Sequence, residues 1–429
     1  MIIIYWVLTI ISVIYILFKN RRFDLFTIAV VFHIYYTFPA LIGVVVVGDG
    51  LYYSEVHFHA YIIISIIMLT LLTTMFLYDR KQYKNQQKDS LGVPGTKYIL
   101  YLLTFLAFSL LIANIGIIGI EPFFNTDKSV LSQHFRGFYD IAIWVALSAI
   151  ILSLQNKNLK IMNLNFFIII FSLFVGSRAY ITLAIISIGL LLLRDKRLKL
   201  IKYKRILFFT GVLALFLTFY KEIYKIIKTF DLSQIIASIT NFETFKDASF
   251  FIESNSIFAS LNIAVEQNFR QDPSVVYDIL VSTVPLLKDI LNFFSNEQIF
   301  ISPRFAPVVS KEFFPYIHWG MGSNIWAEMY SIGGILTILM FLGLWILIIW
   351  YGNKLLISQS FMAPFLLPAI VYSTFYIHRL DLTLVMGAFK IGLGLSIMFF
   401  IIYKISIKPY LSFSYSMRKQ NVNKNINYN

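Results

Sequence analysis

Long apolar runs separated by short polar connectors make up most of the chain and predict membrane-spanning helices. In helical form, about 20 consecutive apolar residues cross a bilayer core. Nine runs approach or reach that length, and they cover residues 2–18, 25–47, 60–78, 98–120, 141–154, 206–220, 321–351, 358–377 and 382–403. A tenth run divides into two, so the pattern predicts an all-α, polytopic membrane protein of about 11 transmembrane helices.

The tenth run, residues 162–193, is too long for one crossing and too short for two full ones. Gly176, Ser177 and Arg178 interrupt it in the middle. A charged residue at membrane depth is costly, which makes it a candidate for function. We therefore expect two short or re-entrant helices that meet at Arg178.

One long stretch, residues 221–319, is too polar to be a span and predicts a folded extramembrane cap. It holds 11 of the 22 acidic residues, mixed with eight cations. Residues 249–267 and 274–294 have helical apolar spacing, and Asp272 followed by Pro273 suits the start of the second helix. Neither is long and apolar enough for a span, so we expect amphipathic helices on the membrane face.

These patterns divide the chain into four parts. Residues 1–220 form an N-terminal transmembrane bundle of about eight spans, two of them short around residues 176–178. Residues 221–320 form the helical cap, residues 321–403 three C-terminal spans, and residues 404–429 a basic tail.

Composition and charge support the membrane class and exclude others. With 58% hydrophobic and 14% charged residues, the chain is far from a soluble profile. The net charge of +14 comes from cations clustered between apolar runs, which does not indicate nucleic-acid binding. The absence of Cys excludes disulfides, thiolate metal sites and Cys nucleophiles. The chain also lacks a P-loop, a Rossmann glycine pattern and an HExxH motif, so we expect no cofactor and no metal.

The distribution of Lys and Arg predicts the side of the membrane that each connector faces. With the amino terminus outside, the inner segments hold 23 of the 36 Lys and Arg residues but only 4 of the 22 acidic ones. Short connectors rich in Lys and Arg face the cytoplasm. The cap therefore faces the periplasm or the cell exterior, where a reaction must use an activated group carried in the membrane.

Five cations on or near the predicted outer face are candidates for binding an anionic group: Arg136, Arg178, Arg304, Arg379 and Lys390. Guanidinium groups bind phosphate oxygens in bidentate geometry. Each cation has a structural alternative. Arg178 could anchor to lipid headgroups, Arg379 could pair with Asp381, and Lys390 could extend its amine out of its span. The other two could be solvated surface charges.

Glu328 and His318 are the candidates for acid–base chemistry. Glu328 lies near the start of the span over residues 321–351, where a partly buried carboxylate suits a general base. His318 lies at the end of the cap, where a histidine could also be merely solvated. Four aromatic residues flank the two candidates: Tyr316, Trp319, Trp326 and Tyr330. They would suit stacking on sugar rings, and an aromatic belt at the membrane interface explains them equally well.

Three short stretches carry a resemblance to a known family. They are Gly176-Ser177-Arg178, residues 277–285 (YDILVSTVP) and residues 328–334 (EMYSIGG). In these stretches and in its topology, the chain resembles the Wzy-type O-antigen and capsule polymerases, which join oligosaccharide repeat units. The stretches are similar to the family's small-Ser-Arg, YLxxLxxxIP and ExYxxxG motifs. The family often has a basic residue straight after the loop proline, whereas Leu286 and Leu287 stand there in this chain.

The resemblance implies a metal-independent glycosyl transfer at the outer face of a bacterial inner membrane, in an architecture like that of GT-C-like polymerases and ligases. A glycan on undecaprenyl diphosphate would be the donor, and a sugar hydroxyl of a lipid-linked repeat unit the acceptor. Arg178 and Arg379 would bind the diphosphate with support from Arg304, and Glu328 or His318 would take the proton. The lipid bilayer, a chain-length regulator and a flippase are the implied partners, and nucleic acid is not.

Two other functions remain open at this stage. An O-antigen ligase would share the donor site and transfer to the lipid A core. A flippase for lipid-linked oligosaccharides would need no catalysis, but it predicts internal repeats and charged residues within spans. No repeat is evident, and only Lys390 lies clearly inside a predicted span.

Overall fold

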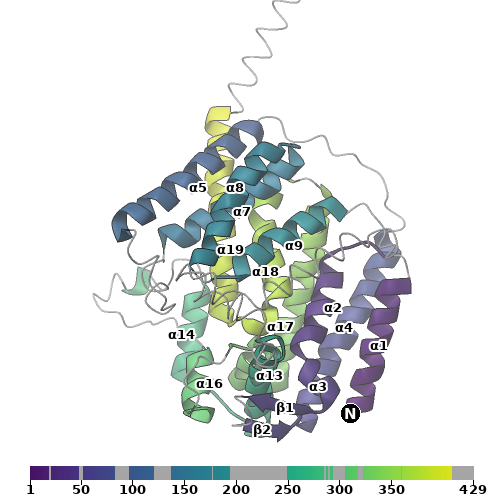
Figure 1. The fold of residues 1–429 in the computed structure, drawn as a ribbon. Helices are drawn as coiled ribbons and strands as arrows, with labels where there is room; N and C mark the ends of the chain where they lie inside the picture. The colour runs from purple at the N-terminus through teal and green to yellow at the C-terminus, as the bar shows by residue number, and fades with distance from the viewer. Residues whose placement is uncertain are drawn as a thin grey trace, which may run out of the picture. The chain divides into compact units, whose positions relative to one another are not determined.

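A computed structural model of the 429-residue chain describes residues 1–18, 21–47, 52–82, 96–119, 137–175, 177–193, 249–284, 287, 290–292, 305–316, 322–358 and 360–407. These residues are mostly helical, with one two-stranded sheet (Figure 1). Five of the described helices are long and apolar enough to cross a membrane. The protein is therefore membrane-embedded, and the predicted all-α class is confirmed at that level; the full span count remains a prediction.

The chain forms two compact units, which are described separately. The first contains residues 1–88, 192–354 and 369–389, and the second contains residues 89–191, 355–368 and 390–429. Four of the described helices contribute residues to both units: α9 (Ala179–Leu193), α17 (Ile325–Ser358), α18 (Ala363–Phe375) and α19 (Leu382–Ile402).

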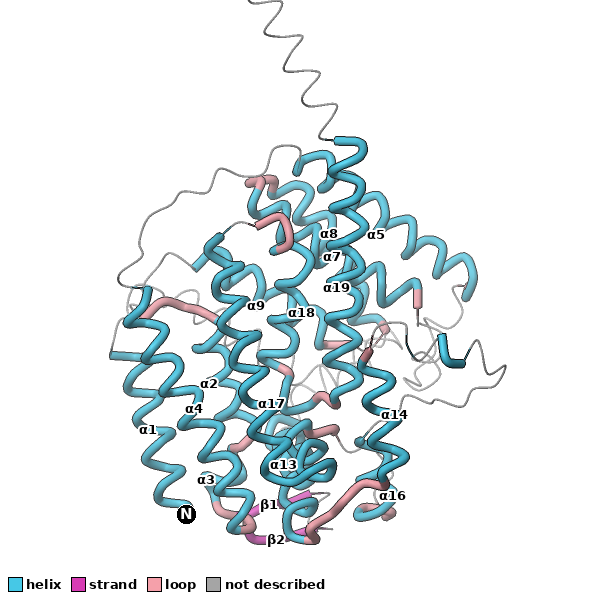
Figure 2. The backbone as a smooth tube through the Cα atoms, turned by 180° about the vertical axis from the view of Figure 1, so that it is seen from behind, coloured by secondary structure: helices cyan, strands magenta, loops and turns pink. Residues whose placement is uncertain are grey.

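The first unit is built on α1 (Ile2–Phe18), α2 (Leu25–Tyr36) and α4 (Phe58–Gln82), which pack side by side (Figure 2). Between α2 and α4 the chain forms the short α3 (Phe38–Ile42) and the antiparallel hairpin of β1 (Val44–Val47) and β2 (Tyr52–Glu55).

The hairpin corrects the prediction of one continuous span over residues 25–47. Helix α2 ends at Tyr36, and Pro39 lies in the first turn of the separate helix α3. Gly43 ends α3 with a φ of +90°, a conformation that favours glycine. The four β-branched valines that follow form a strand, because branched side chains fit a pleated sheet better than a helix.

Helix α13 (Ser249–Glu266) corrects the prediction of an amphipathic helix on the membrane face. Between residues 254 and 265 every side chain except that of Asn255 is buried. The helix packs against α2, α3, α4 and β1. Its Asn262 accepts a hydrogen bond from the His57 backbone N–H (2.7 Å) and donates to the Glu55 carbonyl (3.2 Å). The helix is therefore part of the core of the first unit.

The rest of the described cap consists of α14 (Pro273–Thr283) and α16 (Phe305–Phe313). The predicted start of α14 is confirmed: Asp272 accepts a hydrogen bond from the Ser274 backbone N–H (2.8 Å), and Pro273 occupies the first turn. Tyr277 and Leu280 on this helix are exposed.

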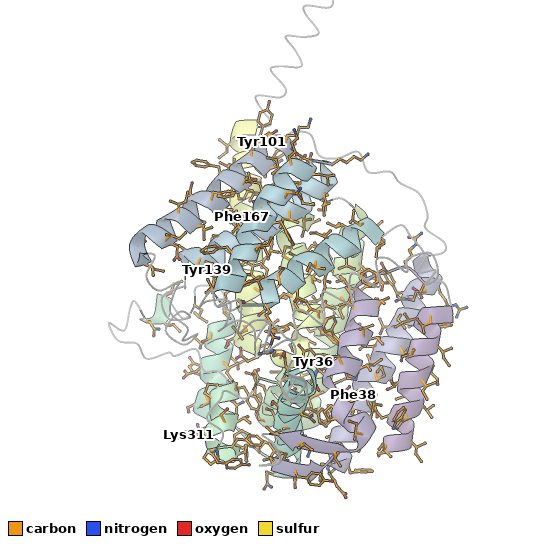
Figure 3. All side chains as sticks on the ribbon, in the orientation of Figure 1. Tyr36, Phe38, Tyr101, Tyr139, Phe167 and Lys311 are labelled. Atoms are coloured by element: carbon orange, nitrogen blue, oxygen red, sulfur yellow. The ribbon has the colours of Figure 1, made fainter. Side chains whose placement is uncertain are left out.

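The second unit contains α5 (Thr96–Ile118), α7 (Phe138–Gln155), α8 (Leu159–Phe174) and α9 (Ala179–Leu193). Helix α7 packs against both α5 and α8, and all its residues from 142 to 153 are buried. Tyr139 of α7 is buried, whereas Tyr101 of α5 and Phe167 of α8 are exposed, as suits side chains that face lipid (Figure 3). Helices α8 and α9 are separate, so the predicted break before Arg178 is confirmed.

Candidate functional site

Glu328 lies in the first turn of α17, in the first compact unit. The Asn324 side-chain oxygen starts this helix by accepting hydrogen bonds from the backbone N–H groups of Trp326 (3.0 Å) and Ala327 (3.3 Å). The Asn324 amide donates to the Ile257 carbonyl of α13 (3.0 Å). This contact fixes the start of α17 against the buried helix and places Glu328 inside the unit, with 0% of its surface exposed.

The Glu328 carboxyl group reaches the amino-terminal end of α19. Its Oε2 accepts a hydrogen bond from the Leu382 backbone N–H (2.7 Å). Its Oε1 is buried and has no hydrogen-bond partner among the described residues. A buried polar atom without a partner costs free energy, and Glu328 Oε1 is the only carboxyl oxygen of this kind among the described residues. This oxygen therefore keeps an unused capacity to accept a hydrogen bond.

Asp381 is a second buried carboxyl group at the same helix end, with 1% of its surface exposed. Its Oδ1 accepts hydrogen bonds from the Leu384 backbone N–H (2.9 Å) and the Thr383 hydroxyl (2.7 Å), so it caps α19. The partial positive charge at a helix amino terminus favours a carboxylate there. Asp381 is therefore occupied by the backbone, whereas Glu328 keeps one oxygen free.

Arg379 lies three residues before Leu382, in the short 3-10 helix η3 (Ile377–Arg379). Its guanidinium group forms an ion pair with Glu253 of α13 and lies over the ring of Tyr376, 5.4 Å from the ring centre. The alternative in which Arg379 pairs with Asp381 is wrong, since Arg379 pairs with Glu253 and Asp381 caps α19. Arg379 and Glu253 are both half-buried. The η3 turn therefore carries a half-buried cation just before the start of α19, where Leu382 donates to Glu328.

Trp326, His378 and His33 form a buried chain of hydrogen bonds behind this turn. The Trp326 indole N–H donates to His378 Nδ1 (2.9 Å), His378 Nε2 lies 3.2 Å from His33 Nδ1, and His33 Nε2 lies 3.2 Å from the Ile64 carbonyl. Burial, with His33 beside it, lowers the pKa of His378 well below its ordinary value. Trp326 is fully buried, so the prediction that it belongs to an interfacial belt or a sugar-stacking surface is wrong.

The loop after α13 holds the segment of α17 that carries Glu328. Arg270 donates to the Tyr330 carbonyl and lies over the Tyr330 ring, 4.5 Å from its centre. The Tyr330 hydroxyl donates to Asn268 (3.1 Å), and Gln271 donates to the Ser331 hydroxyl (2.7 Å). Sequence reasoning missed Arg270, because an exposed loop arginine has no local signal.

Arg178 lies at the start of α9 in the second unit and is half-buried. The preceding turn is closed by two hydrogen bonds between Ser172 and Ser177, of 3.0 and 3.2 Å. The Arg178 carbonyl accepts bonds from the Thr182 backbone N–H (3.2 Å) and hydroxyl (3.1 Å).

Lys390 lies within α19 and is also half-buried. The other predicted site residues, Arg136, Arg304 and His318, lie outside the described residues.

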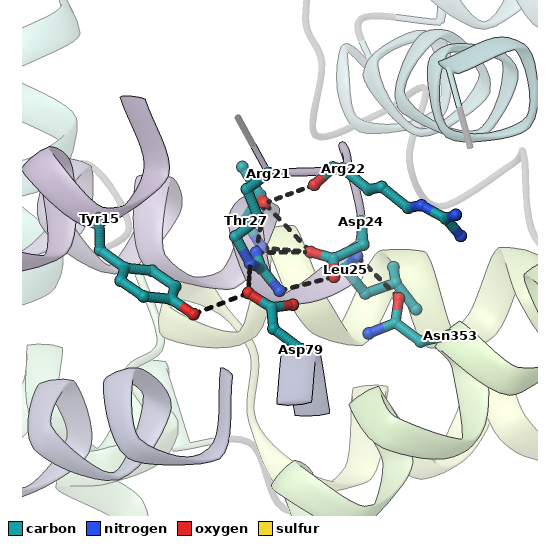
Figure 4. A network of polar contacts seen from close by, with 8 residues as sticks. All are labelled: Tyr15, Arg21, Arg22, Asp24, Leu25, Thr27, Asp79 and Asn353. Carbon is teal, nitrogen blue, oxygen red and sulfur yellow. Dashed lines mark hydrogen bonds and ion pairs between the residues drawn. The ribbon is translucent and has the colours of Figure 1, made fainter. Parts of the chain in front are cut away.

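A second polar cluster in the first unit joins the carboxyl ends of α1 and α4 to the start of α2 (Figure 4). Arg21, only 4% exposed, bonds both oxygens of Asp24 (2.9 and 2.7 Å) and one of Asp79 (2.7 Å). The Tyr15 hydroxyl donates to the same oxygen of Asp79 (2.9 Å). The guanidinium is thus satisfied on several sides, which suits a structural role. The position of Arg21 in a short basic connector gives no sign of this burial.

Over the described ranges, no group of three or more His, Asp or Glu side chains is arranged to hold a metal ion. The site around Glu328 therefore consists of a buried carboxyl group, a half-buried arginine and backbone donors. No protein-family model matches the chain, and no curated protein or solved structure is significantly similar to it.

Proposed function

We propose that the protein polymerises undecaprenyl-diphosphate-linked oligosaccharide repeat units into a surface polysaccharide, O-antigen or capsule, at the outer face of a bacterial inner membrane. It is proposed to act as a metal-independent glycosyltransferase of the Wzy type. The observation that supports the proposal best is the Glu328 carboxyl group, which is buried and has one oxygen free of partners among the described residues.

The proposed reaction needs a base for the acceptor and cations for the leaving group. The acceptor sugar hydroxyl attacks the anomeric carbon of the donor, a new glycosidic C–O bond forms, and the bond from that carbon to the diphosphate oxygen breaks. Glu328 Oε1 takes the hydroxyl proton, and the electron pair of the broken bond leaves with undecaprenyl diphosphate. Undecaprenyl diphosphate is thereby released from the glycan. A positioned base contributes about 10²- to 10⁴-fold in rate.

Arg379 is the proposed diphosphate contact that lies just before the end of α19 to which Glu328 is bonded. Its position three residues before Leu382, the residue bonded to Glu328, supports this role. The diphosphate would compete with Glu253 for the guanidinium, and bidentate pairing with phosphate oxygens would favour the exchange. Arg178, Arg304, Arg136 and Lys390 are proposed as further diphosphate contacts, and His318 as the alternative base. A chain-length regulator and a flippase are the proposed protein partners.

Substituting Glu328 by Gln tests the proposal with little change in shape. The oxygen of the new amide would still accept from the Leu382 N–H, but the amide would not take a proton. We expect Glu328→Gln to lower polymerisation by about 10²-fold or more. In a gene-deletion strain that carries this variant, gel bands of the surface polysaccharide should collapse from a ladder to capped single repeats.

Glu312→Gln is the matched control, because Glu312 is an exposed glutamate on α16. It should restore the ladder at equal amounts of membrane protein. A normal ladder with Glu328→Gln would contradict the role of Glu328. Loss of all surface glycan in the deletion strain, including single repeats, would indicate a ligase or a flippase and would overturn the polymerase proposal.

A further inference from the structure

The chain of bonds from Trp326 to Ile64 has a fixed direction. An indole N–H only donates, so His378 Nδ1 must accept and carries no proton. The proton of neutral His378 is then on Nε2, which donates to His33 Nδ1. His33 in turn carries its proton on Nε2 and donates to the Ile64 carbonyl, which only accepts. One pair of tautomers therefore satisfies every nitrogen in the chain.

These bonds join four elements that are far apart in sequence. Trp326 is in α17, His378 in η3, His33 in α2 and Ile64 in α4. Trp326 is fully buried, as are His33 and Ile64, and 1% of His378 is exposed. The His378 ring also stacks on Tyr36, with the ring centres 5.7 Å apart. These contacts thus hold the η3 turn against α2 and, through His33, connect it to α4.

The η3 turn is also connected to Glu328, through hydrogen bonds to the first turn of α17. Trp326 and Glu328 lie two residues apart in the first turn of α17, and they bond η3 and the first residue of α19 respectively. Trp326 donates to His378, and Glu328 accepts from Leu382, four residues later. The two hydrogen bonds therefore join the start of α17 to residues 378–382 at two points. If η3 moved, the Leu382 N–H would move with it, and Glu328 Oε2 would lose its donor.

We infer that His33 and His378 are positioning residues, which hold the η3 turn so that the Leu382 N–H orients the Glu328 carboxyl group and leaves Oε1 toward the substrate. Neither histidine touches the reacting atoms in this scheme. The inference rests on the proposed function in so far as it assigns a substrate to Glu328. The effect of the two histidines on the orientation of the Glu328 carboxyl group does not depend on the proposed function.

The experiment compares His33→Phe with His33→Gln in the full-length protein reconstituted in lipid nanodiscs. Phenylalanine keeps a ring of similar size but has no nitrogen, whereas the glutamine amide can both accept from His378 and donate to Ile64. Two quantities are measured. One is the infrared band of the Glu328 carboxyl group, identified as the band that Glu328→Gln removes. The other is turnover with undecaprenyl-diphosphate-linked repeat units extracted from the deletion strain.

We expect His33→Phe to shift the Glu328 band and to lower kcat by about 10- to 100-fold, because small misplacements of a catalytic group are costly. KM for the lipid-linked repeat unit should change little, since the substrate contacts are elsewhere. His33→Gln should restore both the band and kcat. Trp326→Phe, which removes the indole N–H together with its five-membered ring and keeps a six-membered ring, provides a second variant should His33→Phe not fold.

The outcomes separate the inference from the proposed function. A shifted band in His33→Phe together with full activity of Glu328→Gln would support the positioning role of the histidines and refute the catalytic role of Glu328. An unshifted band in folded His33→Phe and Trp326→Phe proteins would overturn the inference, whatever their activity. A shifted band in His33→Gln equal to that in His33→Phe would also overturn it, because the hydrogen bonds would then not matter.

Discussion

Arg21 is a charged side chain buried among carboxyl and hydroxyl groups in the first compact unit. Its guanidinium bonds Asp24, Asp79 and Thr27, so the desolvation of the charge is offset by short, charge-assisted hydrogen bonds. Glu328 is buried without such compensation at Oε1. At the scale of single residues, the Arg21 guanidinium thus has its partners, whereas Glu328 keeps one carboxyl oxygen without a partner among the described residues.

Arg21→Met should destabilise the protein strongly. The variant leaves the buried Asp24 and the half-buried Asp79 without their cation, and breaking a buried pair from one side costs about 3–5 kcal/mol. Thermal unfolding of the purified protein in detergent should show a clear fall in Tm. Arg22→Met is the control, because the Arg22 side chain extends away from the cluster (Figure 4). Equal Tm values for the two variants would show that the cluster contributes nothing to stability.

At the scale of elements, the kink in α17 determines the direction of its first two turns. Gly333 and Gly334 depart from helical geometry, and Gly334 has a φ of +70°. Glycine is favoured there chiefly by its backbone conformation, and the Arg270 side chain is close as well. The conformation is strained for other residues, and a Cβ would lie 3.1 Å from Arg270 Nη2. The turns before the kink carry Trp326 and Glu328, so the kink and the Arg270 contact together orient the site.

Gly334→Ala should therefore straighten or strain α17 and disturb the site. We expect a loss of about 1–2 kcal/mol from the left-handed conformation, together with a shorter glycan ladder. Gly343→Ala on the same helix is the matched control, because its added Cβ would meet no atom within 4 Å. This control should be neutral or slightly stabilising, by about 0.5–1 kcal/mol. A wild-type Tm and ladder for Gly334→Ala would contradict the role assigned to the kink.

At the scale of the whole molecule, α17 connects two polar clusters of the first unit. It begins next to Glu328, and near its other end the Asn353 side-chain oxygen accepts from the Leu25 backbone N–H beside the Arg21 cluster (3.0 Å). At about 1.5 Å per residue, the helical stretch from Glu328 to Asn353 covers about 37 Å, more than a hydrocarbon core of about 30 Å. If α17 spans the membrane, Glu328 and Arg21 lie near opposite faces, which agrees with the predicted orientation of the connectors.

Labelling of intact cells tests that orientation. The chain has no Cys, so single-cysteine variants can be labelled selectively with a membrane-impermeant maleimide. We expect Lys246→Cys, in the predicted outer cap, to react, and Lys204→Cys, in the most basic connector, to react only after the membrane is opened. The reverse pattern would place the cap in the cytosol, where the proposed lipid-linked donor and acceptor are not presented.

The sequence by itself determined the features that depend on neighbours along the chain. The apolar runs predicted most helices, the Ser177-Arg178 interruption predicted the break between α8 and α9, and Asp272-Pro273 predicted the start of α14. Such features depend on local hydrophobicity, backbone dihedrals and capping, which a few adjacent residues specify. Glu328 was also found in this way, as an acid near the start of an apolar run, although its partners were not.

Tertiary structure alone decided the pairings between distant residues. His33 and His378 are 345 residues apart, and Arg379 and Glu253 are 126 apart. No local pattern distinguishes these residues from solvated ones, because their roles arise from the packing of α2, α13 and α17 around η3. The burial of α13 was missed for the same reason: its Asn262 bonds the end of the hairpin and the segment that follows it, about 205 residues earlier in the chain. Whether a polar side chain is solvated, structural or reactive depends on which distant backbone group it meets, and only the folded chain brings the two together.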